Sequence, residues 1–225
     1  MTNACILLAA GKGMRFGTSI PKQYICCMRD RLSPIEACIK TAQQAGLAPI
    51  IIVAHIEHAE LIARIFNLNH PTAASSPFDI KDISVILINS MCRMESIKSG
   101  LSALSKYSNI RRIIIHDVAR PFLASSDFTY IARLSPEIVY AQYYMPIIGG
   151  LMHTSGVFCN PVDYKEIVTP LMISSEIAHK VITHAEFEIY PILTDEQKEK
   201  HCVWIKGIYA RLRKITYFSD IPSAL

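Results

Sequence analysis

Small residues and two cations follow a short apolar segment near the start of the chain, within residues 4–24. Residues 5–8 are apolar and bounded by glycine, which is typical of a buried strand in a parallel sheet. Small residues directly after such a strand let the backbone approach a ligand, and consecutive N–H groups there can hold a phosphate. The small residues of this loop are Ala9, Ala10, Gly11, Gly13 and Gly17. Because Arg15 and Lys22 can neutralise phosphate charge, the stretch predicts a phosphate-binding loop.

Two common phosphate motifs do not describe this loop. No Gly-Lys-Ser/Thr opens a helix, as it would in a P-loop, and the glycine spacing differs from the dinucleotide fingerprint. A tight strand-to-helix turn with solvated cations is the plain structural alternative. The order Ala-Ala-Gly, then Arg, then Pro-Lys-Gln favours the phosphate-binding interpretation over that alternative.

A second candidate site is the start of the helix predicted over residues 93–104. Arg93 and Ser96 lie on its first turn, directly after a strand predicted over residues 83–88. The Ser96 hydroxyl could hydrogen-bond a base edge, and a helix N-terminus favours anions. Without other motifs, an ordinary capped and solvent-exposed helix start would be the better interpretation.

A third candidate site is the corner that follows the apolar strand predicted over residues 111–115. Asp117 at this strand end would face the phosphate loop, and its hard oxygens suit Mg²⁺ that keeps water and phosphate as other ligands. Arg120 could pin a substrate phosphate, whereas His116 is expected to pack or orient and is not assigned as a base. The alternative is a surface turn with an aspartate cap and a structural arginine.

The elements that must position these sites alternate along the first half of the chain. Strands are expected over residues 5–8, 49–54, 83–88 and 111–115, and helices over residues 33–46, 58–66 and 93–104, with a surface loop over residues 67–81. This order predicts an α/β fold, Rossmann-like and doubly wound, with a mostly parallel sheet. Ligands bind beyond the carboxyl ends of such strands, which is where the three sites lie.

The second half of the chain carries weaker signals. We expect helices over residues 126–134 and 174–183, strands over residues 137–148 and 203–206, and an edge strand over residues 214–217. The turn-rich segment of about residues 143–165 is interpreted as a protruding arm.

Composition excludes several classes of protein. The formal charge of +4 is mild and the cations are scattered, so nucleic-acid binding is not expected. The longest apolar runs are strand-sized, which argues against a membrane span, and the N-terminus resembles neither a signal nor a transit peptide. The seven cysteines include no CxxC pair, so reduced core thiols in a cytosolic protein are expected and a zinc site lacks support.

The stretch AAGKGMRFGTSIPKQY resembles the nucleotide loop of the cytidylyltransferases that make CDP-linked polyol phosphates. That family includes the methylerythritol-phosphate enzyme of isoprenoid synthesis and the ribitol-phosphate enzymes. Arg-Met-Glu-Ser-Ile and His-Asp-Val-Ala-Arg-Pro resemble two further family motifs. The resemblance covers nearly the whole chain, but it is dense only up to Phe122 and thin after it.

The resemblance implies a single nucleotidyltransferase domain over residues 1–225, with a role for each matched position. The positions matched to CTP binding are Ala9, Ala10, Gly11, Gly13 and Ser96. The positions matched to the reacting phosphates are Arg15, Lys22 and Lys214. Arg120 and Thr169 are matched to the second substrate, and Asp117 to Mg²⁺. For Lys214, the alternative is a solvated lysine on an edge strand. A homodimer, in which the arm helps complete the partner's site, is also implied.

Departures from the family pattern keep a second class of function open. Ser90 stands where the family has glycines that touch the base, and Gly149 where bacterial members have Asp-Thr. Pro161 takes the place of a phosphate-binding arginine, and Leu171 that of a glutamine. The chain could therefore be a degenerate, non-catalytic relative that still binds a nucleotide.

The reaction implied by the resemblance is attack of a polyol phosphate oxygen on the α-phosphate of CTP, with release of pyrophosphate. The attacking phosphate is already ionised, so positioning and charge neutralisation suffice without a general base. The C-terminal Lys-Ile-Thr-Tyr, the missing Asp-Thr and the absence of a transit peptide favour D-ribitol 5-phosphate and the animal enzymes of protein glycosylation. The alternative acceptor is 2-C-methyl-D-erythritol 4-phosphate.

Replacing Lys22 tests the predicted loop. We expect Lys22→Ala to abolish CDP-product formation while the protein stays folded, because loss of one charge-neutralising group costs roughly as much as loss of an oxyanion donor, about 2.7–4 kcal/mol. Product assays with CTP, together with circular dichroism, make the measurement. Unchanged turnover would remove Lys22 from the mechanism.

Overall fold

The computed structural model describes residues 2–26, 28, 31–66, 80–90, 92–147, 149–152, 154–186 and 188–221. Its strands are β1 (Thr2–Ala9), β2 (Ile50–His55), β3 (Ile83–Ile88), β4 (Ile110–Asp117), β5 (Tyr140–Pro146), β6 (Leu151–Met152), β7 (Phe158–Cys159), β8 (Lys165–Ser174) and β9 (Cys202–Lys206). Its α-helices are α1 (Pro34–Gln44), α2 (Ala59–Ile65), α3 (Arg93–Leu104), α4 (Ser125–Ala132), α5 (Ser175–Thr183), α6 (Asp195–Lys200) and α7 (Tyr209–Leu212). Most of the loop predicted over residues 67–81 lies outside the described residues.

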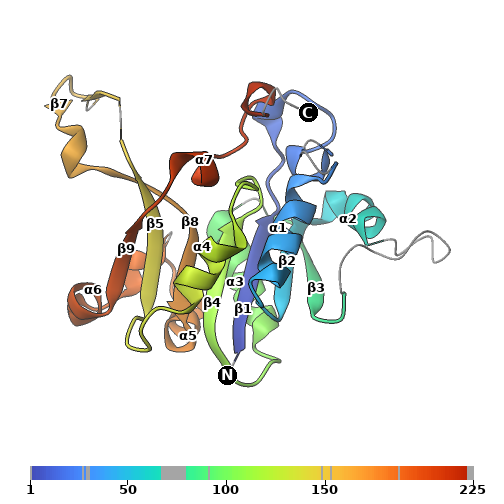
Figure 1. Cartoon of the computed structure of the whole chain (residues 1–225), viewed down its shortest axis with the longest axis horizontal. Helices are drawn as coiled ribbons and strands as arrows, with labels where there is room; N and C mark the ends of the chain where they lie inside the picture. Colours follow the sequence, from blue (N-terminus) through green and yellow to red (C-terminus); the bar gives the residue numbers. More distant parts are fainter. Residues whose placement is uncertain are drawn as a thin grey trace.

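One seven-stranded sheet forms the centre of the molecule (Figure 1). Its strand order is β3-β2-β1-β4-β8-β5-β9. All neighbouring pairs are parallel except those of β8, which runs antiparallel to both β4 and β5. The predicted α/β, Rossmann-like fold with a mostly parallel sheet is confirmed.

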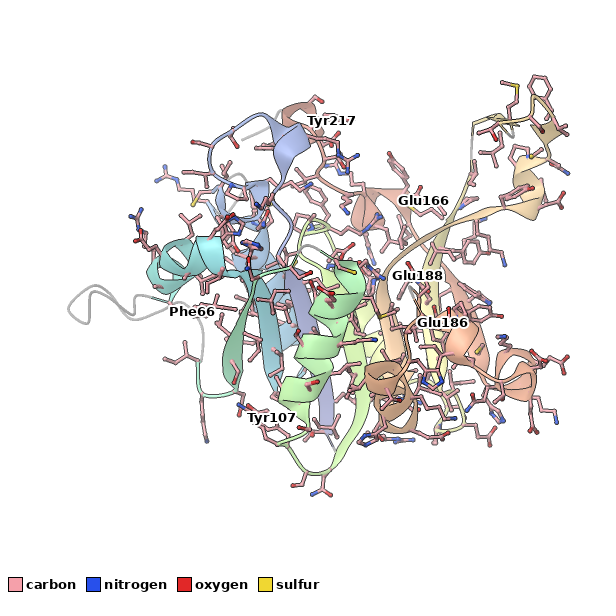
Figure 2. All side chains as sticks on the ribbon, turned by 180° about the vertical axis from the view of Figure 1, so that it is seen from behind. Phe66, Tyr107, Glu166, Glu186, Glu188 and Tyr217 are labelled. Atoms are coloured by element: carbon pink, nitrogen blue, oxygen red, sulfur yellow. The ribbon has the colours of Figure 1, made fainter. Side chains whose placement is uncertain are left out.

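Two apolar layers cover the sheet. The layer against α1, α2 and α4 includes Ile39, Ile62 and Phe128, whereas the layer against α3 and α5 includes Ile97 and Val181. Figure 2 shows the second layer from behind, with α3 and α5 in front of the strands. Strands buried on both faces must be apolar throughout, which explains the uninterrupted run of Ile and Val in β2.

Local signals set the ends of α1 as expected. Ser33 and Glu36 form a reciprocal capping box, and Pro34 occupies the first turn. The Ser33 N–H donates to Glu36 Oε2 at 2.7 Å. Gly46, with φ 71°, follows the last turn and takes the left-handed conformation that ends many helices.

Strand β8 was not predicted, because Pro170 interrupts its apolar run. The structure accommodates this proline at a break of register in which Gln142 pairs with Leu171 but Tyr143 pairs with Val168. Thr169 and Pro170 therefore bulge out of the ladder between β5 and β8, and the strand continues on both sides.

The arm and the C-terminal stretch differ in how well the sequence predicted them. The two-stranded sheet of β6 and β7 lies beyond the ends of β5 and β8, away from the main sheet, as expected of an arm (Figure 1). The prediction of an edge strand over residues 214–217 is wrong, because α7 turns the chain after β9. Ile215 is instead buried against Phe16.

Two composition-based expectations can be compared with the structure. Among the described residues, no helix combines the length and apolar character needed to cross a bilayer. Cys5 and Cys38 are buried free thiols, but Cys26 and Cys92 are exposed, so the expectation of core thiols holds for only some of the cysteines.

Close packing of α3 on the sheet gives a test of the fold. A Cβ atom at Gly100 would lie 2.7 Å from Ile6 Cγ2 and 3.2 Å from Val53 Cγ2. We expect Gly100→Ala to lower the free energy of unfolding by about 1–3 kcal/mol through overpacking, whereas Gly→Ala in an uncrowded helix stabilises by about 1 kcal/mol. Urea unfolding measures the change. Gly149→Ala, where a Cβ meets no atom within 4 Å, is the control; equal stability of Gly100→Ala and wild type would contradict the packing.

Candidate active site

The site lies where the direction of strand addition reverses. The chain places β2 and β3 on one side of β1 and then returns to place β4 on the other side. In the parallel pairing of β1 with β4, Leu8 is opposite Asp117. The loop after β1 and the corner after β4 therefore emerge side by side, at the switch point where open α/β sheets bind ligands.

A cavity of about 490 Å³ opens at this point. It brings together all three regions that sequence analysis selected and adds the C-terminal lysine. The predicted residues that line it are Ala9, Ala10, Gly11, Gly13, Arg15, Lys22, Ser96, Asp117 and Lys214. Lys12, Gln23 and Arg93 also line it and were not among the predicted site residues.

The loop after β1 is held in shape by Gln23. Its Nε2 donates to the carbonyl oxygens of Ala9, at 2.9 Å, and Gly11, at 2.6 Å. Gly13 has φ 64°, in the left-handed region that favours glycine, and a Cβ at this position would lie only 3.4 Å from the backbone nitrogen of Lys22. These contacts keep the backbone folded around the cavity, with Lys22 at its end.

Lys22 is a buried cation with other cations nearby. Its side chain is almost buried, with 8% of the residue exposed. Burial, followed by repulsion from Lys214 and Arg15, lowers the pKa of Lys22 from 10.5 to about 8, although Asp220 and Asp117 act in the opposite direction. Such a crowded cation is stabilised when an anion enters the cavity.

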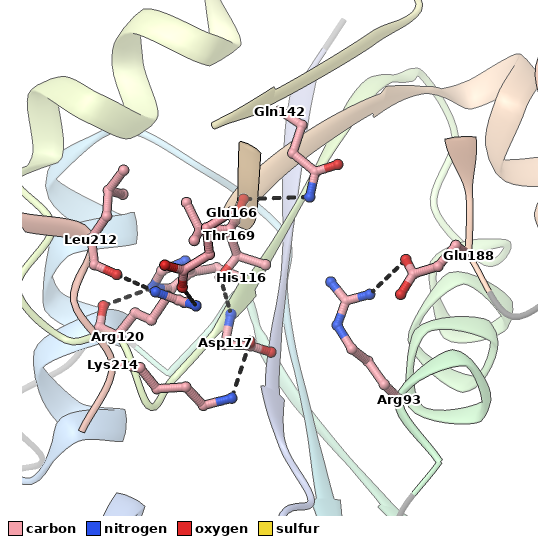
Figure 3. Close-up of polar contacts among 11 residues, drawn as sticks. Arg93, His116, Asp117, Arg120, Gln142, Glu166, Thr169, Glu188, Leu212 and Lys214 are labelled. Atoms are coloured by element: carbon pink, nitrogen blue, oxygen red, sulfur yellow. Dashed lines mark hydrogen bonds and ion pairs between the residues drawn. The ribbon is translucent and has the colours of Figure 1, made fainter. Parts of the chain in front are cut away.

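Lys214 reaches the cavity from the other end of the chain. Its Nζ lies 3.8 Å from Asp117 Oδ2, as Figure 3 shows. The neighbouring Ile215 N–H donates to the Ala119 carbonyl at 2.8 Å, and Ile215 packs against Phe16. The C-terminal stretch is thus fastened to both the β4 corner and the loop after β1. Lys214 does not lie on an edge strand, although its side chain is 39% exposed.

Ser96 and Ser90 have different environments. Ser96 is buried on the first turn of α3, lines the cavity, and its Oγ donates to the Cys92 carbonyl at 3.1 Å. The Oγ lone pairs can still accept from a base amino group. Ser90 Oγ accepts from the Cys92 N–H at 3.1 Å, and Ser90 does not line the cavity.

Arg120 and Thr169 line a neighbouring cavity of about 410 Å³ that shares Arg93 and Asp117 with the first. Buried Arg120 donates to the Leu212 carbonyl, and its Nη2 lies 3.7 Å from Glu166 Oε1 (Figure 3). Thr169 Oγ1 accepts from the Asp117 N–H at 3.1 Å. Both residues hold the corner in place as well as facing the second cavity.

His116 is fully buried beneath the same corner. Its Nε2 lies 3.0 Å from the Arg120 carbonyl oxygen, and its ring packs edge-on against Phe128. Burial lowers the pKa of His116 to about 4, so the ring is neutral near pH 7. This agrees with the expectation that His116 packs and orients.

Asp117 is the one carboxylate that faces the first cavity among its described lining residues. No group of three or more His, Cys, Asp or Glu side chains gathers to hold a metal ion among the described residues. Mg²⁺ usually takes one or two carboxylates and completes its shell with water and phosphate oxygens. Asp117, whose side chain is 20% exposed, fits that mode of binding together with a triphosphate.

Comparisons with known proteins agree with this geometry. The model of the family "IspD: 2-C-methyl-D-erythritol 4-phosphate cytidylyltransferase" matches residues 4–147. The chain belongs to this family. It is 34% identical to the bifunctional enzyme IspD/IspF of Rhodobacter capsulatus over 127 residues. This aligned region covers 56% of the chain and 28% of that protein. It is 26% identical over 208 residues to the 2-C-methyl-D-erythritol 4-phosphate cytidylyltransferase of Bacteroides fragilis. That match covers 87% of the chain and 84% of the relative.

Solved structures show the same fold. The 4-diphosphocytidyl-2C-methyl-D-erythritol synthase of Anaerococcus prevotii superposes with a TM-score of 0.73 at 17% identity, covering 98% of this chain and 92% of that one. The chain spans about half or less of the first curated relatives that it matches. The family model and the relatives from Clostridium botulinum and Bacteroides fragilis bear the name of the methylerythritol-phosphate enzyme, and the sequence-based preference for the ribitol-phosphate type gains no support from these comparisons.

The motifs quoted above contain three lining residues to which the sequence analysis assigned no role, Lys12, Gln23 and Arg93. Lys12 lies in the same loop, with Nζ 3.2 Å from Glu57 Oε2. Arg93 Nη1 lies 3.4 Å from Glu188 Oε2. Lys12 and Gln23 occur within the quoted loop motif, so cation and amide content could have indicated them, but their partners are set by tertiary structure.

The crowded charge of Lys22 predicts a trade-off between function and stability. We expect Lys22→Met to raise the melting temperature of the ligand-free protein, because it removes a buried cation repelled by its neighbours. The gain in melting temperature should be largest below about pH 8, where Lys22 is charged in both the native and the unfolded protein. It should fade as the pH rises to 10.5, because native Lys22 loses its proton first and the cost of the buried charge disappears.

Thermal unfolding at pH 7 and pH 10 measures this effect. Lys12→Met is the control, because Lys12 lines the same cavity but is paired with Glu57. A lower melting temperature for Lys22→Met at pH 7, or a gain that does not change with pH, would contradict the assignment.

Proposed function

We propose that this chain is a CTP-dependent cytidylyltransferase that transfers CMP to the phosphate of a sugar alcohol phosphate and releases pyrophosphate. The observation that carries the proposal is the meeting of Lys22, Asp117 and Lys214 in one cavity at the switch point of the sheet. Family membership supports the same chemistry.

The cavity suits a triphosphate in both shape and charge. Backbone around Ala10 and Gly11 would contact phosphate oxygens, and Arg15, Lys22 and Lys214 would neutralise their charge. Ser96, which lines the same cavity from the first turn of α3, would accept from the cytosine amino group.

The chemical step needs little from acid–base groups. An oxygen of the acceptor phosphate attacks the α-phosphorus of CTP, the bond from that phosphorus to the bridging oxygen breaks, and pyrophosphate leaves. The attacking oxygen is already anionic, so in-line positioning and charge neutralisation lower the barrier. Neutral, buried His116 has no role in proton transfer.

Asp117 would hold Mg²⁺ together with the phosphates. The bound ion would supply Lewis-acid neutralisation of the reacting phosphates. In the ligand-free cavity the carboxylate faces Lys214 Nζ at 3.8 Å, so this lysine is already positioned next to the place where charge develops.

The acceptor that family membership favours is 2-C-methyl-D-erythritol 4-phosphate. D-Ribitol 5-phosphate is the second candidate because of the C-terminal Lys-Ile-Thr-Tyr and the glycine at position 149, where bacterial members have Asp-Thr.

A homodimer is part of the proposal. The arm exposes large apolar side chains, which a soluble monomer rarely gathers without a partner surface. The exposed apolar residues of the arm are Met152, Val157, Phe158, Val162 and Tyr164.

Pyrophosphate release from CTP tests the function. With Mg²⁺ and 2-C-methyl-D-erythritol 4-phosphate we expect release that depends on both substrates, and little release with D-ribitol 5-phosphate. Lys22→Ala is the matched inactive control. The reverse preference would select the ribitol reaction. No release with either acceptor would favour a non-catalytic nucleotide-binding relative.

A further inference from the structure

The second cavity differs in chemistry from the first. The first is lined by several cations and one carboxylate, whereas the second combines two arginines with hydroxyl, amide and carboxylate groups, among them groups from β5, β8 and the segment before α6. Its lining includes Tyr140, Gln142, Thr169 and Glu188. The two cavities share Arg93 and Asp117, so a molecule in the second cavity would meet the reacting phosphates at that common wall.

Both arginines of the second cavity already face a carboxylate. Arg93 Nη1 lies 3.4 Å from Glu188 Oε2, and Arg120 Nη2 lies 3.7 Å from Glu166 Oε1 (Figure 3). Arg120 also donates to the Leu212 carbonyl. A phosphate placed in this cavity would therefore meet the carboxylates of Glu188 and Asp117, which line it, as well as two cations. The charge arrangement does not favour a second phosphate there.

Hydroxyl groups suit this cavity better. A carboxylate offers two oxygens with several lone-pair sites and accepts hydrogen bonds from alcohols. Glu188 is 65% exposed at its side chain, so one carboxylate oxygen can bind a ligand while the other faces Arg93. The Gln142 amide accepts from the Tyr140 hydroxyl and donates to the Val168 carbonyl. These two hydrogen bonds fix the orientation of the amide in the cavity wall.

We propose that Glu188 is a specificity-determining residue that accepts a hydrogen bond from a hydroxyl of the acceptor's polyol chain. The acceptor would lie with its phosphate at the Asp117 wall and its hydroxyl-bearing chain in the second cavity. This inference rests on the proposed function, because it names how the acceptor of that reaction is recognised.

Steady-state kinetics with matched variants test the proposal. Hydrogen bonds to charged groups contribute about 1.5–3 kcal/mol, so we expect Glu188→Ala to raise the acceptor KM about tenfold or more. Glu188→Gln, which keeps an acceptor oxygen, should lie between Glu188→Ala and wild type. The KM for CTP should change less than twofold. Glu186→Gln, an exposed neighbour outside the cavity (Figure 2), is the control and should match wild type.

Deoxy acceptors make the test specific to a hydroxyl. In a series of acceptor phosphates that each lack one hydroxyl, one member should bind equally well to wild type and to Glu188→Ala. An unchanged acceptor KM, an equal rise in the KM for CTP, or a Glu188→Ala effect that survives every deletion would overturn the proposal.

Direct binding separates this inference from the proposed function. Trp204, the chain's single tryptophan, lies 5.2 Å from the ring of Tyr190, which lines the second cavity. Titration of the protein with 2-C-methyl-D-erythritol 4-phosphate, in the presence of a non-transferable CTP analogue, should change tryptophan fluorescence. The Kd for this acceptor should be higher for Glu188→Ala than for wild type. If turnover is absent but this difference is seen, the proposed function fails and the inference stands. Equal binding by the two proteins overturns the inference.

Discussion

The parallel pairing of β1 with β4 is the constraint on which the site depends. It sets Leu8 opposite Asp117, so the loop after one strand and the corner after the other must leave the sheet together. Both strands are buried on two faces along most of their length. The first polar groups beyond these strands therefore meet at the edge of the sheet and face a common cavity.

The site concentrates positive charge at a cost to the ligand-free protein. Lys22 is buried near Arg15 and Lys214, and its pKa is lowered first by burial and then by repulsion from these two cations. Asp117 and Asp220 offset part of it. An arrangement of this kind is stabilised by a bound polyanion, so charge that weakens the empty protein is available to the reacting phosphates. Lys22, Arg15 and Lys214, which repel one another, thus lie where a triphosphate would be bound.

Arg120 shows how one residue can serve several elements at once. Its guanidinium joins the β4 corner to the C-terminal stretch through Leu212 and to the base of the arm through Glu166. Because Lys214 follows Leu212 by two residues, this contact also fixes the approach of Lys214 to Asp117. The sequence-based expectation of a free phosphate clamp is therefore incomplete, since Arg120 first of all holds together three segments distant in the sequence.

The sequence by itself determined the elements with strong local signals and the residue types of the site. Strand β3 and helix α3 have the predicted bounds, and capping by Ser33 begins α1, because periodicity and capping act within a few residues. Only the tertiary structure decided the course of β8 past Pro170 and of the stretch around Lys214, where distant partners outweigh local propensity. The same holds for the contacts of Arg93 with Glu188 and of Lys12 with Glu57. Each joins residues far apart in the chain, and their meeting depends on how the strands are ordered in the sheet.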